Sequence, residues 1–279
     1  MREVGIETLL IKGQGIAQCY ERPMWRVAGD VDLFLDAPNY EKASAFLPSL
    51  ASSTGENRPE TKHFAMNIDS WIVELHGTLR SQLGRRIDRV IDAVQDDTFS
   101  NGRVRVWDDG GVDILLPAPD NDVIFVFSHI LQHFFRGGIG LRQICDWCRL
   151  LWTYRDSIDR SLLETRIREM RLGTEWKAFA AYAVDCLGMP AEAMPLYSSS
   201  RRWSRKARRI DKFILEVGNF GHNRDNSFYS KYPYLVYKAV SLWRHIGDSL
   251  RHFLIFPTDS VRVFLITLGQ GFKAVGKGE

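Results

Sequence analysis

Apolar and polar residues alternate along short stretches in the first part of the chain. Val31, Leu33 and Leu35 share one face of such a stretch, while Asp32 and Phe34 share the other. A period of two is typical of a β-strand. The short linkers 69–70 and 108–111 separate further apolar runs in pairs and predict two hairpins. The predicted strands cover 8–11, 31–35, 62–68, 71–76, 104–107 and 112–116.

Helical spacing is rare before Pro117 and common after it. Before it, apolar residues at helical spacing predict one helix over 39–50, and a short helix is expected to begin within 16–20. After it, Asp120 is a good helix start, and the apolar residues recur every three or four positions. The later helices are predicted over 121–135, 141–152, 161–170, 174–187, 203–217, 232–254 and 260–273. We therefore predict an α+β protein with an α/β domain over 1–116 and a mostly helical domain over 117–279.

Composition narrows the class of protein without indicating a function. Apolar residues make up 45% of the 279 residues and charged residues 25%, which excludes disordered, collagen-like and fibrous chains. The formal net charge of +3 is too small to indicate binding of polyanions by the whole surface. Four cysteines and a start without a signal-peptide pattern favour a reducing, cytoplasmic location. No apolar run reaches the ~18 residues of a membrane span, and no supporting layer is expected before the first strand.

The strongest chemical signal is a pair of aspartates at the start of a predicted strand. Asp30 and Asp32 are two positions apart, so their side chains lie on one face at a separation of ~6–7 Å. Carboxylates this close repel unless a cation lies between them, and Mg²⁺ prefers such hard oxygen ligands. Glu74, in the strand 71–76, would complete a two-metal site if the two strands were neighbours. Alternatively, Asp30 caps a turn and Asp32 is an exposed strand residue.

A glycine-containing turn precedes the aspartates. Lys12-Gly13-Gln14-Gly15 lies between the first predicted strand and a short helix. Such a turn presents backbone N–H groups to an anion such as phosphate.

Taken together, these motifs resemble the uncharacterised nucleotidyltransferase family of the DNA polymerase beta superfamily. The resemblance covers roughly residues 5–155, and Asn219–His222 could extend it. The residues that carry it are Leu10–Gly15, Tyr20, Arg26, Gly29–Asp32, Glu74–His76, His129-x-x-x-His133 and Leu141-Arg142-x-x-x-Asp146.

The resemblance implies a minimal nucleotidyltransferase fold, with a mixed sheet and helices, that moves a nucleoside monophosphate from an NTP to an acceptor hydroxyl. Two Mg²⁺ ions, or alternatively Mn²⁺, would be held by Asp30, Asp32 and Glu74. In this scheme Glu74 binds the second ion and helps to deprotonate the acceptor. The acceptor itself, whether small molecule, protein or RNA, is not specified by the resemblance.

The resemblance also implies nucleotide and substrate contacts. Gly13 and Gly15 would contact the triphosphate through the backbone, and Gln14 stands where the superfamily usually has serine. Lys12 and Arg26 would neutralise phosphate charge, although Arg26 could equally pair with one of the two aspartates. Further substrate contacts are expected from His76, His133 and Arg142.

Three alternatives remain open at this stage. A catalytically inactive protein could keep the same fold as a binding module for RNA or a protein partner, and the basic run 201–209 is a candidate for a weak RNA contact. Cys145 and Cys148 could join His129 and His133 in a zinc site, or they could simply pack in the core. Arg142 could pair along its helix with Asp146, four positions later, instead of reaching a phosphate.

Overall fold

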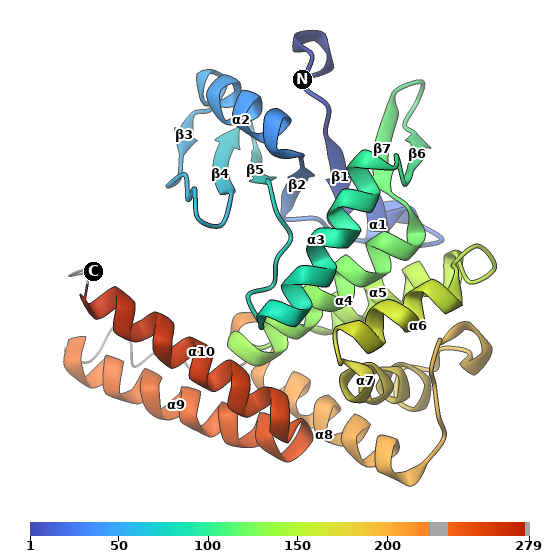
Figure 1. Ribbon diagram of the computed structural model, residues 1–279, viewed down its shortest axis with the longest axis vertical. Helices are drawn as coiled ribbons and strands as arrows, with labels where there is room; N and C mark the ends of the chain where they lie inside the picture. The colour runs from blue at the N-terminus through green and yellow to red at the C-terminus, as the bar shows by residue number, and fades with distance from the viewer. Residues whose placement is uncertain (222, 224–233, 277–279) are drawn as a thin grey trace. The chain divides into compact units, whose positions relative to one another are not determined.

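The structure is a computed structural model that describes residues 1–221, 223 and 234–276. It contains a mixed five-stranded sheet, a separate two-stranded hairpin and long helices that follow (Figure 1). The predicted α+β class is therefore confirmed.

The five strands of the main sheet lie in the order β1-β2-β5-β4-β3. The strands β2 and β5 are parallel, and the other neighbouring pairs are antiparallel. The second sheet is the hairpin β6-β7. The strands are β1 (Leu9–Ile11), β2 (Asp30–Phe34), β3 (Ser53–Thr54), β4 (His63–Ile68), β5 (Trp71–His76), β6 (Val104–Asp108) and β7 (Asp113–Pro117).

Helices connect the strands and make up the later part of the chain. The α-helices are α1 (Gly13–Ala17), α2 (Ala37–Phe46), α3 (Arg85–Ser100), α4 (Pro119–Arg136), α5 (Leu141–Thr153), α6 (Arg160–Glu169), α7 (Gly173–Asp185), α8 (Arg201–Val217), α9 (Tyr234–Ile255) and α10 (Pro257–Gly276). Short 3-10 helices are η1 (Arg2–Val4), η2 (Pro23–Trp25), η3 (Leu47–Ser49), η4 (Ala191–Ala193) and η5 (Asn219–Gly221).

The chain forms two compact units, each built from several segments. The sheet unit comprises Met1–Arg80, Arg89–Val126 and Arg149–Leu163, and the helical unit comprises Ser81–Asp88, Phe127–Cys148 and Glu164–Glu279. The expected separation into domains at residues 116 and 117 remains a prediction.

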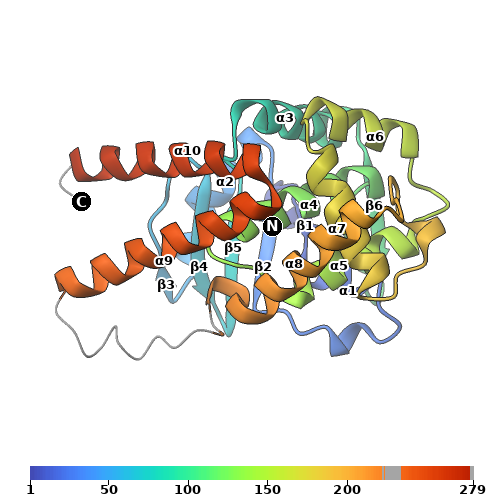
Figure 2. The same cartoon turned by 90° about the horizontal axis from the view of Figure 1, so that it is seen from below.

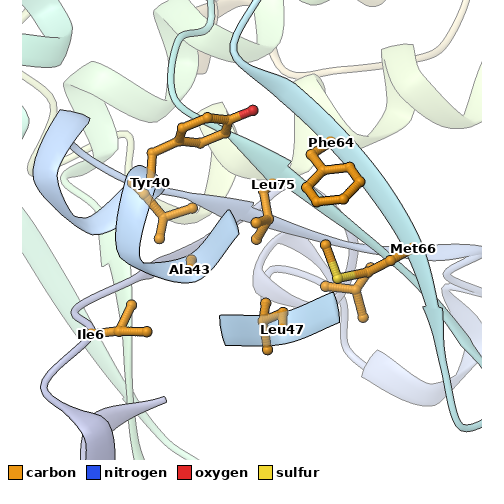
Figure 3. Close-up of a cluster of buried hydrophobic side chains, with 9 residues drawn as sticks. Ile6, Tyr40, Ala43, Leu47, Phe64, Met66 and Leu75 are labelled. Carbon is orange, nitrogen blue, oxygen red and sulfur yellow. The ribbon is translucent and has the colours of Figure 1, made fainter. Parts of the chain in front are cut away.

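One face of the main sheet is covered by α2. Tyr40, Ala43 and Leu47 pack against Phe64 and Leu75 in a buried apolar cluster (Figure 3). Ile6 and Met66 complete the part of this cluster that the figure labels. Because strand side chains alternate between faces, the burial of Leu75 on this side leaves Glu74 and His76 on the opposite face.

The opposite face of the sheet carries both polar and apolar side chains. Phe34, at the end of β2, is fully buried, and its ring lies 4.8 Å from that of Phe99 and 5.5 Å from that of Phe125. These aromatic contacts anchor α3 and α4 to the sheet within the sheet unit. The polar side chains at the start of β2 therefore extend from a firmly packed strand.

The helical unit has an aromatic core of its own. The ring of Phe127 lies within 6.0 Å of the rings of Trp147, Trp176 and Phe179. Figures 1 and 2 show α9 and α10 side by side in this unit. None of the helices in the described part of the chain combines the length and apolarity needed to cross a membrane.

Most predicted elements are present at nearly the predicted positions. Both hairpins form, and the helices after Pro117 agree with the pattern to within a few residues at each end. Three differences stand out: α1 begins at Gly13, before the expected start, and neither β3 nor α3 is predicted. Ile87, Val90, Ile91 and Val94 are the buried positions of α3, and they follow helical spacing within a segment rich in arginine and aspartate.

Candidate active site

Parallel pairing of β2 with β5 brings the candidate carboxylates together. In this register Asp32 lies directly opposite Glu74, and Asp30 lies opposite Ile72. The three carboxylates share the face of the sheet that α2 does not cover. A local pattern places Asp30 beside Asp32, whereas the sheet topology places Glu74 beside them.

Asp32 is the buried member of the group, with 3% of its surface exposed. Its Oδ1 accepts hydrogen bonds from Lys12 Nζ at 3.0 Å and from His76 Nε2 at 2.7 Å. Burial by itself would raise the pKa of this carboxyl, but the charge of Lys12 and the contact with His76 outweigh burial and lower the pKa to about 2. Asp32 is therefore ionised at neutral pH.

Asp30 has a different environment although it lies only two residues away. In the described part of the chain, its carboxylate forms no hydrogen bond or ion pair. Partial burial raises its pKa, and repulsion by Asp32 and Glu74 raises it further. The more distant charges of Lys12 and Arg26 only partly offset this effect. An unpartnered carboxylate beside two others is the arrangement that a bound cation stabilises.

Glu74 is held by two histidines. His63 Nε2 lies 3.1 Å and His76 Nε2 lies 3.5 Å from Glu74 Oε2. Hydrogen bonds from His63 and then His76 hold the pKa of Glu74 well below its usual range, despite partial burial. The carboxylate is consequently ionised at neutral pH and a weak proton acceptor.

His63 is a site residue that the sequence prediction missed. It lies on β4 directly opposite His76 on β5. The sequence contains a feature that locates His63. A two-residue turn at 69–70 pairs Ile68 with Trp71, and this pairing sets the register of the whole β4–β5 hairpin. Continuing that register along both strands pairs the two histidines.

The donor set is suited to divalent metal ions. Asp30, Asp32 and Glu74 offer the oxygen ligands that Mg²⁺ and Mn²⁺ prefer. Glu74 also belongs to a second set with His63 and His76, whose ligand atoms all lie within 4.8 Å of one another. Adjacent ligands at about 2.1 Å from a metal are themselves about 3 Å apart, which matches the distances from Glu74 to the two histidines. In the described residues this is the only such set, and Cys145, Cys148, His129 and His133 are not gathered in this way.

The glycine turn contributes differently from the expectation. Lys12 has a φ of 54°, a strained conformation for a non-glycine residue, and its ammonium group pairs with Asp32. Gln14 Nε2 donates to the Asp30 carbonyl at 3.4 Å, which ties the turn to the start of β2. A Cβ at Gly15 would lie 2.5 Å from Leu116 Cδ2, so a larger residue there would require the Leu116 side chain to move. Arg26 donates to the Val27 carbonyl, and its charge acts on Asp30.

His133 and Arg142 belong to the helical unit, whereas the carboxylates belong to the sheet unit. His133 Nε2 lies 2.8 Å from His129 Nε2, one turn earlier on α4. Arg142 is exposed near the start of α5. Their contact with a substrate remains a prediction, and His222 lies outside the described residues.

Comparison with known proteins agrees with this geometry. No curated protein and no solved structure matches the chain. The family model described as "uncharacterised nucleotidyltransferase" matches residues 1–188, which include both strands of the carboxylate site. Because this match covers more than half of the 279 residues, the chain belongs to the uncharacterised nucleotidyltransferase family.

Proposed function

We propose that the protein transfers a nucleoside monophosphate from an NTP to an acceptor hydroxyl, with the help of Mg²⁺ or Mn²⁺. The observation that carries the proposal is the group of three carboxylates on one face of β2 and β5, where Asp32 and Glu74 lie opposite each other. The unpartnered carboxylate of Asp30 gives this group an excess of negative charge that a divalent cation would neutralise.

In the proposed reaction, the acceptor oxygen forms a bond to the α-phosphorus. The bond from that phosphorus to the bridging oxygen breaks, and pyrophosphate leaves. A metal ion bound by Asp30, Asp32 and Glu74 would supply Lewis-acid activation of the hydroxyl and charge stabilisation for the leaving pyrophosphate. The protein positions these ligands through the hydrogen bonds of Lys12, His63 and His76.

The electrostatics refine the role of Glu74. A base that takes the hydroxyl proton needs a pKa close to the working pH. The two histidines lower the pKa of Glu74. We therefore assign Glu74 the role of metal ligand, and the proton of the metal-activated hydroxyl passes to solvent water.

Basic residues near the site would bind the triphosphate. Arg26 lies on the segment that leads to β2 and acts electrostatically on Asp30. Lys12 is already paired with Asp32, so its proposed phosphate contact requires it to bridge the carboxylate and the nucleotide. Gly13, Gln14 and the backbone around them remain the proposed site of contact with the triphosphate chain.

The test is a transfer assay with labelled NTPs, Mg²⁺ or Mn²⁺ and a panel of protein, RNA and small-molecule acceptors. Asp30→Asn is the informative variant, because this side chain has no hydrogen bond to lose. Loss of a group that only orients a metal ligand typically lowers metal affinity or activity by roughly 10–100-fold. We therefore expect loss of the proposed ligand Asp30 to reduce transfer by at least about 100-fold. Asp69→Asn is the matched control, since Asp69 is exposed in the β4–β5 turn and its φ of 52° is tolerated by asparagine.

NTP binding in the presence of the metal separates the outcomes further. In the presence of the metal ion, the wild type and Asp69→Asn should bind NTP more tightly than Asp30→Asn does. Equal NTP binding by all three proteins, together with no labelled product from any acceptor, would overturn it.

The second candidate function is a binding module of the same fold without turnover. The observation that favours it is the set of cationic side chains on α8, in the helical unit. RNA binding that Asp30→Asn leaves unchanged, combined with no transfer by the wild type, would support this candidate.

A further inference from the structure

Two neighbouring cavities in the helical unit are lined by arginine and lysine side chains. The first, of about 440 Å³, lies between α8 and the end of α6 with the start of α7, and its cationic lining is Arg168, Arg171, Lys177 and Arg202. The second, of about 600 Å³, has Arg201, Arg205 and Arg208 as its cationic lining. Both cavities are contained within the helical unit and share the N-terminal half of α8.

The lining carries a large excess of positive charge for a chain whose formal net charge is only +3. In the first cavity four cations face one carboxylate, Glu164, and none of the described residues that line the second cavity is acidic. None of these seven cations forms an ion pair within the described part of the chain. Unpaired cations that line concave surfaces attract an anionic ligand.

The structure divides the basic run 201–209 into two groups with different roles. Lys206 and Arg209 donate to the carbonyl oxygens of Ile255 and Leu254, so they fasten α8 to the end of α9. The remaining basic residues of the run line the two cavities. The outward-facing group, Arg201, Arg202, Arg205 and Arg208, is thus available for a ligand, while Lys206 and the exposed Arg209 attach α8 to α9.

Helix geometry spreads the outward charges into a row. Arg201, Arg205 and Arg208 are spaced i, i+4 and i+7 and therefore lie on one face of α8, over roughly 10 Å of its length. A row of three cations can contact successive phosphates of a polymer and is longer than a single small anion requires.

An aromatic side chain beside the cations narrows the ligand class. Trp203 lines the first cavity, and the Arg202 guanidinium lies over its ring at 4.8 Å from the centroid. Aromatic rings next to cationic grooves are characteristic of proteins that bind single-stranded nucleic acid, because bases stack while cations contact the backbone. An acidic peptide would use the charges but not the ring.

We propose that the two cavities along α8 form a binding site for single-stranded RNA. The phosphates contact Arg201, Arg205 and Arg208 along the helix and Arg168 and Arg202 in the first cavity, where a base stacks on Trp203. This proposal does not depend on the proposed nucleotidyl transfer, because it requires neither the carboxylates nor a metal ion.

The test is fluorescence anisotropy with a labelled 12-nucleotide single-stranded RNA and the full chain at a series of salt concentrations. The triple substitution Arg201→Gln, Arg205→Gln and Arg208→Gln should weaken binding at least 10-fold at low salt. Each lost phosphate contact reduces the slope of log K against log salt by about 0.7, so the triple variant should lose a slope of about 2. Asp30→Asn should bind RNA like the wild type, whether or not transfer activity exists.

Matched variants separate the site from general charge and folding effects. Lys212→Gln removes a cation from α8 outside both cavities and should change affinity less than two-fold. Substitution of the same three arginines by lysine should restore most of the binding, and Trp203→Leu should weaken binding while leaving the salt slope unchanged. Circular dichroism and thermal unfolding check that each variant is folded.

Three results would overturn the proposal. The first is RNA binding by the folded triple-glutamine variant that equals wild-type binding. The second is poly-glutamate that competes as well as RNA of equal charge, which would indicate a site for acidic proteins. The third is binding of ATP or inorganic polyphosphate without measurable binding of the 12-nucleotide RNA.

Discussion

At the scale of single residues, the two aspartates of β2 show how strongly the surroundings control a side chain. Both point to the same face of the sheet, but Asp32 is buried with hydrogen bonds from Lys12 and His76, while Asp30 has no partner in the described part of the chain. The hydrogen bonds of Asp32 stabilise the protein. The carboxylate of Asp30 is instead repelled by Asp32 and Glu74, which costs stability.

The contrast predicts opposite effects on the stability of the metal-free protein. Asp32→Asn should lower the free energy of unfolding by about 1.5–3 kcal/mol, since charged hydrogen bonds from Lys12 and His76 are weakened. Asp30→Asn should leave it unchanged or raise it, because repulsion with Asp32 and Glu74 is relieved. Urea unfolding at neutral pH with chelator present measures both values. Equal destabilisation by the two substitutions would contradict this account of the site.

At the scale of secondary-structure elements, β5 connects the site to the core. Its polar side chains, Glu74 and His76, lie on the site face, while Val73 and Leu75 belong to the cluster under α2. Gly77 directly follows the strand, and its N–H donates to the Lys62 carbonyl at 2.8 Å. A rigid end of this strand keeps His76 in contact with Asp32.

Packing at this strand end makes a second prediction. A Cβ at Gly77 would lie 2.9 Å from the Tyr40 ring and from Lys62 Cβ, so Gly77→Ala should displace α2 or β4 and destabilise the protein by about 1–3 kcal/mol. Gly29→Ala is the matched control, because its added Cβ meets no atom within 4 Å. Denaturant unfolding compares the two alanine variants. A loss of stability in Gly29→Ala as large as that in Gly77→Ala would refute the packing argument.

At the scale of the whole molecule, ion pairs join residues that are far apart in the chain. Within the helical unit, Arg86 Nη2 donates to Asp259 Oδ1 at 2.6 Å and Arg86 Nε donates to the Met170 carbonyl at 2.7 Å. Arg262 also pairs with Asp259. Glu175 is only 2% exposed and interacts with Asp259. Burial, and to a smaller extent the negative charge of Asp259, raises the pKa of Glu175 to about 8.

The raised pKa of Glu175 implies that stability depends on pH. The folded state holds this proton more tightly than the unfolded state. The contribution of Glu175 to the free energy of unfolding is therefore complete below the ordinary pKa of glutamate, about 4.3, and is lost as pH rises towards about 8. Between pH 5.5 and 8.5 we expect the free energy of unfolding to fall by at least about 1 kcal/mol, because one pKa unit corresponds to about 1.4 kcal/mol. Glu175→Gln should flatten this dependence in urea titrations. A wild-type curve that rises with pH, or a variant as pH-dependent as the wild type, would contradict it.

Local patterns were sufficient for much of the fold and part of the site. Alternation placed Asp30 and Asp32 on one face, the short turn at 69–70 set the β4–β5 register, and helical spacing located the helices after Pro117. The exception is α3, whose buried positions have helical spacing within a strongly charged segment. These features depend on residues close together in the chain.

The tertiary structure decided which local features meet. Parallel pairing of β2 with β5 brought Glu74 to Asp32, and the β4–β5 hairpin added His63. Contacts with the end of α9 engaged Lys206 and Arg209 and left the other cations of the run 201–209 without such a contact. By itself, the sequence determined the periodicity, the turns and the types of chemical group. Strand neighbours and buried partners depend on the joint packing of distant segments, and no local pattern carries that information.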